Sequence, residues 1–234
     1  MSPILEKIWI HPALLELRWE AKVHSEILKM QESLYTQLLR FAGIQELRIG
    51  FHTLTILFEE LQSAQERYGW EKRIEACPIV ANEYPSQHWR IPVCYELGKD
   101  LQSFATSKDM TPKDVIELHS KPFYLLHFYG FLPGFMYLGG LDNRLVSNRK
   151  SIPDRRVEAG SVGIGGSQTG IYTLPSPGGW HIIGKTPLNL FEVEKTPPVQ
   201  PKIGDRISFY PIEKDEFDNL SQLIKSEMYE WRHE

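Results

Sequence analysis

Glycine is concentrated in one part of this 234-residue chain, and that concentration limits the folds the chain can adopt. Twelve of the seventeen glycines lie between Gly130 and Gly184, interleaved with aromatic residues and four prolines. Glycine serves where the backbone takes a positive φ or where another group must approach closely, and proline fixes φ and lacks an amide donor. Such a segment cannot form a helix bundle. It predicts a folded sheet whose loops have fixed shapes, and binding residues commonly lie in such loops.

The KipI/allophanate-hydrolase-subunit-1 family has signature blocks that resemble three stretches of this region, GFLPGFMYLGGLD, AGSVGIGGSQTGIY and SPGGWHIIGKTPLNLF. The resemblance extends over roughly residues 90–212 and is only a pattern of elements before that. Bacterial members of the family are the B subunit of the ATP-dependent 5-oxoprolinase. The resemblance therefore implies a protein that works with the A and C subunits of that enzyme, of which the KipA-like C subunit is the closer partner. The enzyme opens the lactam of 5-oxo-L-proline to L-glutamate at the expense of ATP.

Two other functions are compatible with the same resemblance. The KipI branch of the family inhibits a sporulation histidine kinase, and the older family name comes from allophanate- or urea-processing enzymes. No feature of the sequence separates these alternatives from the 5-oxoprolinase interpretation.

The composition is that of an ordinary globular protein, with 41% hydrophobic and 24% charged residues, and the length allows two modest cores. The net charge is −4 and the Lys and Arg residues are scattered, which argues against nucleic-acid binding because that function needs a basic face. Cys77 and Cys94 have no CxxC spacing. We expect reduced, buried thiols of a cytoplasmic protein, in preference to a metal site or a disulfide.

The chain gives no sign of a targeting or membrane segment. Its first residues, MSPILEKIWIHP, carry charges and lack an apolar stretch of signal-peptide length. Residues 122–141 contain no charged side chain, but they include two prolines, four glycines and His127. A membrane-spanning helix must satisfy its backbone internally, so we expect none here.

The first part of the chain predicts alternating strands and helices of an α+β protein. Residues 13–19 alternate apolar and polar side chains, as in a half-buried strand, whereas residues 22–41 repeat apolar side chains at helical spacing. Further segments then follow, namely strands at 44–51 and 53–59, a helix at 61–76 and a last strand at 88–96. The order β-α-β-β-α-β predicts a ferredoxin-like α/β sandwich domain over residues 1–91.

Residues 92–234 are predicted to form a second domain. Two short helices come first, and the second of them has Thr111 as N-cap, Pro112 at the first helical position and Asp114 in its first turn. Strands and turns extend to about residue 212, and a closing helix follows. The family resemblance implies that this domain is a cyclophilin-like β-barrel.

Two glycine motifs imitate nucleotide-binding loops. Residues 179–186, GWHIIGKT, match the phosphate-loop expression GxxxxGK[ST], but the apolar residues inside the match favour a strand and Pro187 follows in place of a helix. Residues 160–170 resemble a dinucleotide loop, but Gln168 stands at the third glycine position and no helix follows. The chain is therefore expected to bind no cofactor itself, and the resemblance assigns ATP to the complex.

Candidate ligand-binding residues lie in and near the glycine-rich region. A tight turn that presented Gln168 and Thr169 would offer groups that hydrogen-bond an amide or lactam ring, and a purely structural turn explains them equally well. Arg149 can grip a carboxylate or lie solvated. His119 ends a helix, where the dipole favours an imidazolium as a cap or in a site, whereas His127 is predicted to be a core residue. With the resemblance, we predict eight substrate-binding residues: Gln168, Thr169, Tyr172, Gly178, Gly179, Trp180, His119 and Arg149.

No catalytic residue can be recognised in the sequence. One residue also departs from the pattern of the family that the chain resembles. Family members usually have Pro-Arg where this chain has Pro153-Asp154, so an acid replaces a cation.

Aromatic residues crowd the segment from Phe128 to Tyr137. Alternate side chains of a strand face opposite ways, so either both faces are covered or one forms an exposed aromatic patch of the kind found at interfaces. We predict a partner interface formed by Phe131, Phe135 and Tyr137, with the wall of a site for a planar ligand as the alternative.

Overall fold

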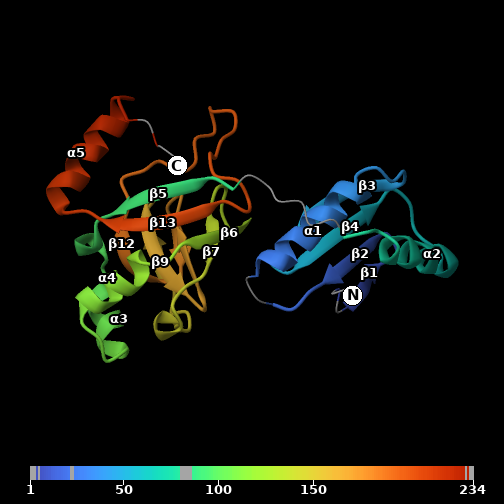
Figure 1. The fold of residues 1–234 in the computed structure, drawn as a ribbon, viewed down its shortest axis with the longest axis horizontal. Coiled ribbons are helices and arrows are strands. Elements are labelled where there is room, and N and C mark those ends of the chain that lie inside the picture. Colours follow the sequence, from blue (N-terminus) through green and yellow to red (C-terminus); the bar gives the residue numbers. More distant parts are fainter. Residues whose placement is uncertain (1–3, 5, 22–23, 80–85, 230, 232–234) are drawn as a thin grey trace. The chain divides into compact units, whose positions relative to one another are not determined.

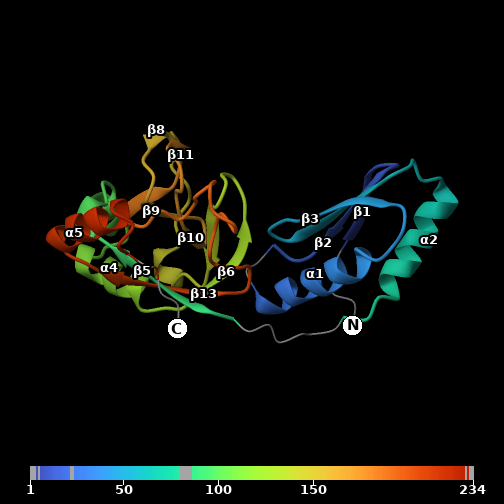
Figure 2. The ribbon, with the colours of Figure 1, turned by 90° about the horizontal axis from the view of Figure 1, so that it is seen from above.

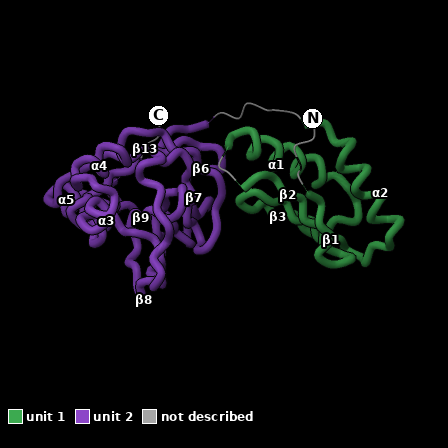
Figure 3. The backbone as a smooth tube through the Cα atoms, turned by 90° about the horizontal axis from the view of Figure 1, so that it is seen from below, with its two compact units in different colours: residues 1–84 green, residues 85–234 purple. Residues whose placement is uncertain are grey.

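The computed structural model describes the chain except for residues 1–3, 5, 22–23, 80–85, 230 and 232–234. The chain divides into two compact units, Met1–Tyr84 and Pro85–Glu234 (Figure 3). Each unit has its own large hydrophobic core. The mixed α and β character predicted from the sequence is confirmed.

The first unit is a four-stranded antiparallel sheet with two helices (Figure 1). Its strands are β1 (Glu6–His11), β2 (Leu14–Arg18), β3 (Ile44–Ile49) and β4 (Thr53–Phe58), in the order β1-β2-β4-β3. Its helices are α1 (Ser25–Leu38) and α2 (Ala64–Glu75). Alternate residues of β2 and β4 are fully buried and share one core with the apolar sides of both helices. Both helices therefore pack on the same face of the sheet.

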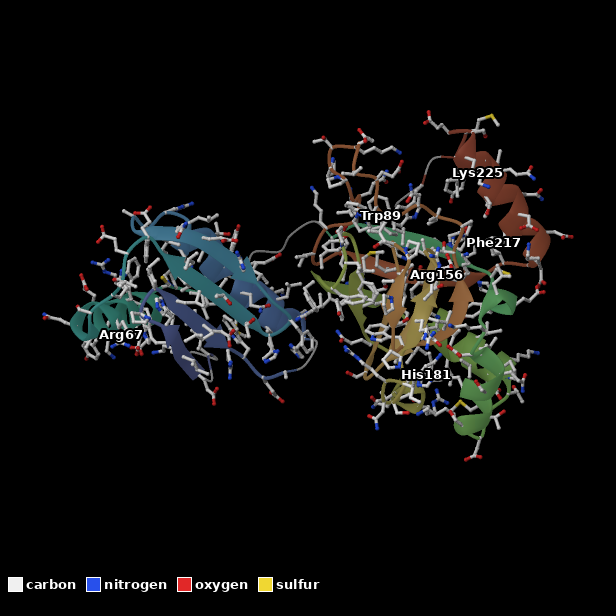
Figure 4. The ribbon with its side chains drawn as sticks, turned by 180° about the vertical axis from the view of Figure 1, so that it is seen from behind. Arg67, Trp89, Arg156, His181, Phe217 and Lys225 are labelled. Atoms are coloured by element: carbon white, nitrogen blue, oxygen red, sulfur yellow. The ribbon has the colours of Figure 1, made fainter. Side chains whose placement is uncertain are left out.

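The strand predicted at 88–96 does not complete this sheet. It is β5 (His88–Val93), which pairs in parallel with β13 (Arg206–Pro211) in the second unit. Trp89, which Figure 4 labels, is buried and holds the strand there, because its Nε1 donates a hydrogen bond to Asp205 Oδ2 at 2.9 Å. The edge beside β2 is taken instead by β1, which was not predicted. The ferredoxin-like arrangement is thus not confirmed, and the predicted boundary after residue 91 would cut β5.

The second unit contains a seven-stranded sheet in the order β12-β9-β10-β7-β6-β13-β5. The remaining strands are β6 (Tyr124–Tyr129), β7 (Met136–Gly139), β9 (Ser161–Gly165), β10 (Gln168–Ile171) and β12 (His181–Lys185). The two ends of the sheet meet where Cys94 N donates to Lys185 O at 2.8 Å and Lys185 N donates to Cys94 O at 3.0 Å. The sheet is therefore a nearly closed barrel. The barrel was predicted, and its cyclophilin-like arrangement stays a prediction.

Short helices and one ribbon complete the second unit. The helices are α3 (Leu101–Ser107), α4 (Pro112–Ser120) and α5 (Lys214–Lys225). The predicted start of α4 is confirmed, since Asp114 N donates to Thr111 Oγ1 at 3.2 Å. Strands β8 (Asp154–Val157) and β11 (Ser176–Gly178) form a two-stranded ribbon that projects from the barrel (Figure 2). Within the described residues, no helix is long and apolar enough to cross a membrane.

Candidate functional site

A pocket of about 250 Å³ opens on the second unit beside the β8–β11 ribbon. Eight of its ten lining residues were predicted from the sequence, five as substrate-binding and three as interface residues: Tyr172, Gly178, Gly179, Trp180 and Arg149, and Phe131, Phe135 and Tyr137. Pro153 and Pro177 complete the lining. Residues of the two predicted groups thus line the same pocket.

The floor of the pocket is a layer of aromatic side chains that lies on glycines of β9 and β10. A Cβ at Gly165 would lie 2.6 Å from the Trp180 indole, and a Cβ at Gly170 would lie 3.1 Å from the Phe135 ring. The Phe135 and Trp180 rings meet edge to face, with their centres 5.4 Å apart. Both side chains are almost completely buried. Only residues without a Cβ allow this approach, which explains why glycine stands at positions 165 and 170.

Phe131 forms the rim of the pocket. Its φ is 63°, and Leu132 N donates a hydrogen bond to Gly130 O at 2.7 Å across it, which makes a γ-turn. A positive φ at a bulky residue is strained, and such strain persists only where the surroundings hold it. Thr173 Oγ1 anchors the same loop by donating to Pro133 O at 2.6 Å. The turn leaves Phe131 60% exposed. The Phe131 and Phe135 rings meet edge to face, with their centres 5.5 Å apart.

Tyr172 places a hydroxyl group at the pocket. Burial raises the pKa of Tyr172, while a hydrogen bond from the Trp180 backbone and the charge of Arg149 oppose the shift. The phenol is therefore protonated at neutral pH and can donate a hydrogen bond to a ligand.

Arg149 is the cation of the pocket. Its guanidinium carbon lies 5.7 Å from the centre of the Trp180 ring, and the residue is exposed. Among the described residues, no carboxylate forms an ion pair with Arg149. A planar guanidinium beside aromatic faces suits a small, flat anion, because it binds a carboxylate through two parallel hydrogen bonds.

Gln168 and Thr169 do not line the pocket. The tight turn exists, but it lies before them, and both residues belong to β10. Thr169 is fully buried and Gln168 is 9% exposed. The expectation that an exposed turn presents them to a ligand is wrong. The QTGI segment forms strand β10, which is buried and is paired on both sides, with β7 and β9.

His119 is a core residue rather than a cap or part of the pocket. It is fully buried, with Nδ1 2.7 Å from the Tyr95 hydroxyl and Nε2 2.9 Å from Thr169 Oγ1. Thr169 Oγ1 donates to Gly163 O at 3.0 Å, so it accepts from His119 Nε2–H, and Nδ1 accepts from Tyr95. Burial lowers the pKa of His119 to about 3. The imidazole is neutral, and the expected imidazolium at the helix end is absent.

Three further expectations concern metals, nucleotides and buried residues. Residues 181–185 form strand β12, so the stretch that matches the phosphate-loop expression is not a loop before a helix. His127 is buried, as predicted. Both cysteines are free thiols, but only Cys94 is buried as expected, because Cys77 lies partly exposed. In the described part of the chain, no group of three His, Cys, Asp or Glu residues could hold a metal ion.

The fold and the pocket define a mixed α/β barrel protein with a pocket lined by aromatic side chains and one guanidinium. The chain belongs to the carboxyltransferase domain family, subdomains C and D, which it matches over residues 9–200. The family resemblance inferred from the sequence blocks is thereby confirmed.

Several relatives carry informative names. The chain is 38% identical over 181 residues to the B subunit of 5-oxoprolinase from Haemophilus influenzae, covering 74% of this chain and 82% of the relative. It is 47% identical over 128 residues to the B subunit of 5-oxoprolinase from Bacillus subtilis, and this match spans about half of each chain, 53% in both cases. The crystal structure of K. lactis urea amidolyase shares the fold, with a TM-score of 0.78 and 18% identity, over 100% of this chain and 17% of that chain.

Proposed function

We propose that this chain is the B subunit of a 5-oxoprolinase and that it binds the lactam substrate in the aromatic pocket. The observation that carries the proposal is the pairing of Arg149 with the buried Trp180 in a pocket of about 250 Å³. Relatives that bear the same name support it. The reaction is the ATP-dependent opening of 5-oxo-L-proline to L-glutamate, carried out together with the A and C subunits in the cytoplasm.

The chemistry of the pocket matches the parts of 5-oxo-L-proline. Its five-membered ring is compact and nearly flat, so it packs in the corner formed by Tyr137 and Trp180, whose rings meet edge to face with their centres 5.7 Å apart. Its carboxylate pairs with Arg149. We expect its amide group to hydrogen-bond the neutral Tyr172 hydroxyl or the backbone of Gly178 and Gly179, all of which line the same pocket.

The ATP-dependent step belongs to the partner proteins in this proposal. An unactivated lactam opens slowly at neutral pH, and phosphorylation of its oxygen makes the ring carbon a better target for water. In this chain, the segment that imitates a phosphate loop is strand β12. We therefore expect this chain to hold and orient the lactam while a partner transfers the phosphoryl group.

Reconstitution tests the proposal. The purified chain alone should turn over neither ATP nor 5-oxo-L-proline, whereas co-expression with the A and C subunits should release L-glutamate in an ATP-dependent manner. Omission of this chain from the assembly should abolish glutamate release. Robust ATP hydrolysis by the chain alone, or full lactam cleavage without it, would contradict the proposal.

A further inference from the structure

We propose that Lys150 is a positioning residue that holds Arg149 over Trp180 and thereby gives the pocket its preference for carboxylates. The choice of 5-oxo-L-proline as the ligand rests on the proposed function. The role of Lys150 rests on the geometry alone.

The backbone on each side of Arg149 is hydrogen-bonded to the segment around Trp180, which joins β11 to β12. His181 Nε2 donates to Asn148 O at 2.9 Å, and Lys150 N donates to Gly179 O at 2.7 Å. His181 lies on the second unit, where Figure 4 labels it. Arg149 is thus the middle residue of a three-residue segment that is bonded at both ends to residues 179–181. The Arg149 side chain can rotate, but its Cα is fixed beside the indole.

The Lys150 side chain adds a third attachment, through two carboxylates. Its Nζ donates to Asp100 Oδ2 at 2.7 Å and to Asp154 Oδ2 at 2.8 Å. Asp100 Oδ2 also accepts from Ile182 N at 2.7 Å, so one carboxylate oxygen joins Lys150 to strand β12. The Lys150 side chain is 18% exposed and that of Asp100 is 16% exposed. Partly buried charge-assisted bonds of this kind are stronger than those on an open surface.

The charges of this cluster leave Arg149 uncompensated. Lys99 Nζ lies 2.8 Å from Asp154 Oδ2, so two lysines face two aspartates and the four charges sum to zero. Asp154, where the resembled family usually has arginine, is therefore matched by Lys99 and Lys150. Because the cluster is neutral, the positive charge at the pocket is that of Arg149, and the bonds of Lys150 fix the backbone from which the Arg149 side chain extends.

NMR spectroscopy of the full-length chain tests this role directly. The Nε–H signal of Arg149, assigned by its loss in Arg149→Lys, should be shifted upfield by the ring current of Trp180. In Lys150→Met the signal should move to the position of a solvent-exposed arginine. Asp100→Asn, which keeps an oxygen for the Ile182 amide and removes the charge partner of Lys150, should move it in the same direction. Lys150→Arg should retain most of the wild-type shift.

Ligand titrations supply the second readout. Affinity for 5-oxo-L-proline should fall at least fivefold in Lys150→Met, while affinity for 2-pyrrolidinone, the same ring without a carboxylate, should stay within twofold. Lys99→Met, which removes only the outer partner of Asp154, should leave both affinities within twofold. An unchanged Arg149 signal in a folded Lys150→Met variant, or an equal loss of both ligands, would overturn the proposal.

The titrations and the NMR signal give different results when the proposed substrate is wrong and when the proposed role of Lys150 is wrong. If the wild-type chain binds other five-membered-ring carboxylates but not 5-oxo-L-proline, the proposed substrate is wrong. The Arg149 signal in Lys150→Met then still decides whether Lys150 is a positioning residue, because that measurement needs no ligand.

Discussion

The hydroxyl of Tyr172 occupies the space that a side chain at Gly178 would need. A Cβ at Gly178 would lie 2.3 Å from Tyr172 Oη and 2.8 Å from the nearest ring carbons. Because residue 178 is glycine, the β8–β11 ribbon can lie close to the aromatic floor of the pocket. The next residue differs, since a Cβ at Gly179 would make only ordinary contacts, the shortest at 3.6 Å to Lys150 O. A substitution at Gly179 can therefore serve as the control for the same substitution at Gly178.

Gly178→Ala should destabilise the second unit and close part of the pocket. Overpacking against a buried aromatic ring typically costs about 1–3 kcal/mol, because neighbouring side chains must shift. Chemical denaturation should show this loss, and ligand titration should show weaker binding. Gly179→Ala should remain close to wild type in both measurements. Equal behaviour of the two variants would mean that the ribbon moves freely and that the approach of Tyr172 is not a constraint.

His119 should make the stability of the second unit depend on pH. Its folded-state pKa of about 3 lies below the ordinary value of 6.5, so the unfolded chain takes up the proton first as pH falls. The contribution of neutral His119 to the free energy of unfolding is complete above pH 6.5. It is lost as pH falls toward 3, by up to about 1.4 kcal/mol for each pH unit.

His119→Gln tests this dependence, because glutamine can also accept from Tyr95 and donate to Thr169. Unfolding free energies measured between pH 6.5 and pH 5, above the range where most carboxylates titrate, should fall less steeply in the variant than in wild type. Parallel curves would show that His119 is not a neutral core residue.

Strand β5 decides where the chain can be divided. A fragment of residues 86–234 retains β5 with Trp89 and its bond to Asp205, and we expect it to melt cooperatively. A fragment of residues 92–234 loses most of β5, which exposes the inner side of β13 and leaves Asp205 without the indole donor. This shorter fragment should aggregate or melt without a cooperative transition. Equal stability of the two fragments would place β5 outside the core of the second unit.

Local patterns in the sequence predict much of this structure. The helical repeat before residue 41, the cap at Thr111 and the strand character of GWHIIGKT depend on neighbours along the chain, and the structure has all three. The glycine and aromatic content of the segment from Gly130 to Gly184 also indicated where the pocket lies, because the two residue types are packed on each other there.

Other features depend on long-range pairing that no local pattern reports. The strand at 88–93 has the same appearance in either unit, and its parallel pairing with residues 206–211 fixes its place. Gln168 and Thr169 follow a real turn, but whether a turn residue is exposed depends on which strands flank the hairpin. The ion pairs of Lys150 with Asp100 and Asp154 join segments up to 50 residues apart, so their role could be recognised only from the coordinates.

In the proposed function, this chain binds the carboxylate of the lactam through Arg149. The most direct test is steady-state kinetics of the reconstituted three-component enzyme with Arg149→Met, with 5-oxo-L-proline as the varied substrate and assembly checked by size-exclusion chromatography. We expect intact assembly and a rise in KM of at least tenfold, equivalent to about 1.4 kcal/mol of binding energy. An assembled Arg149→Met enzyme with unchanged KM and kcat would contradict the proposal.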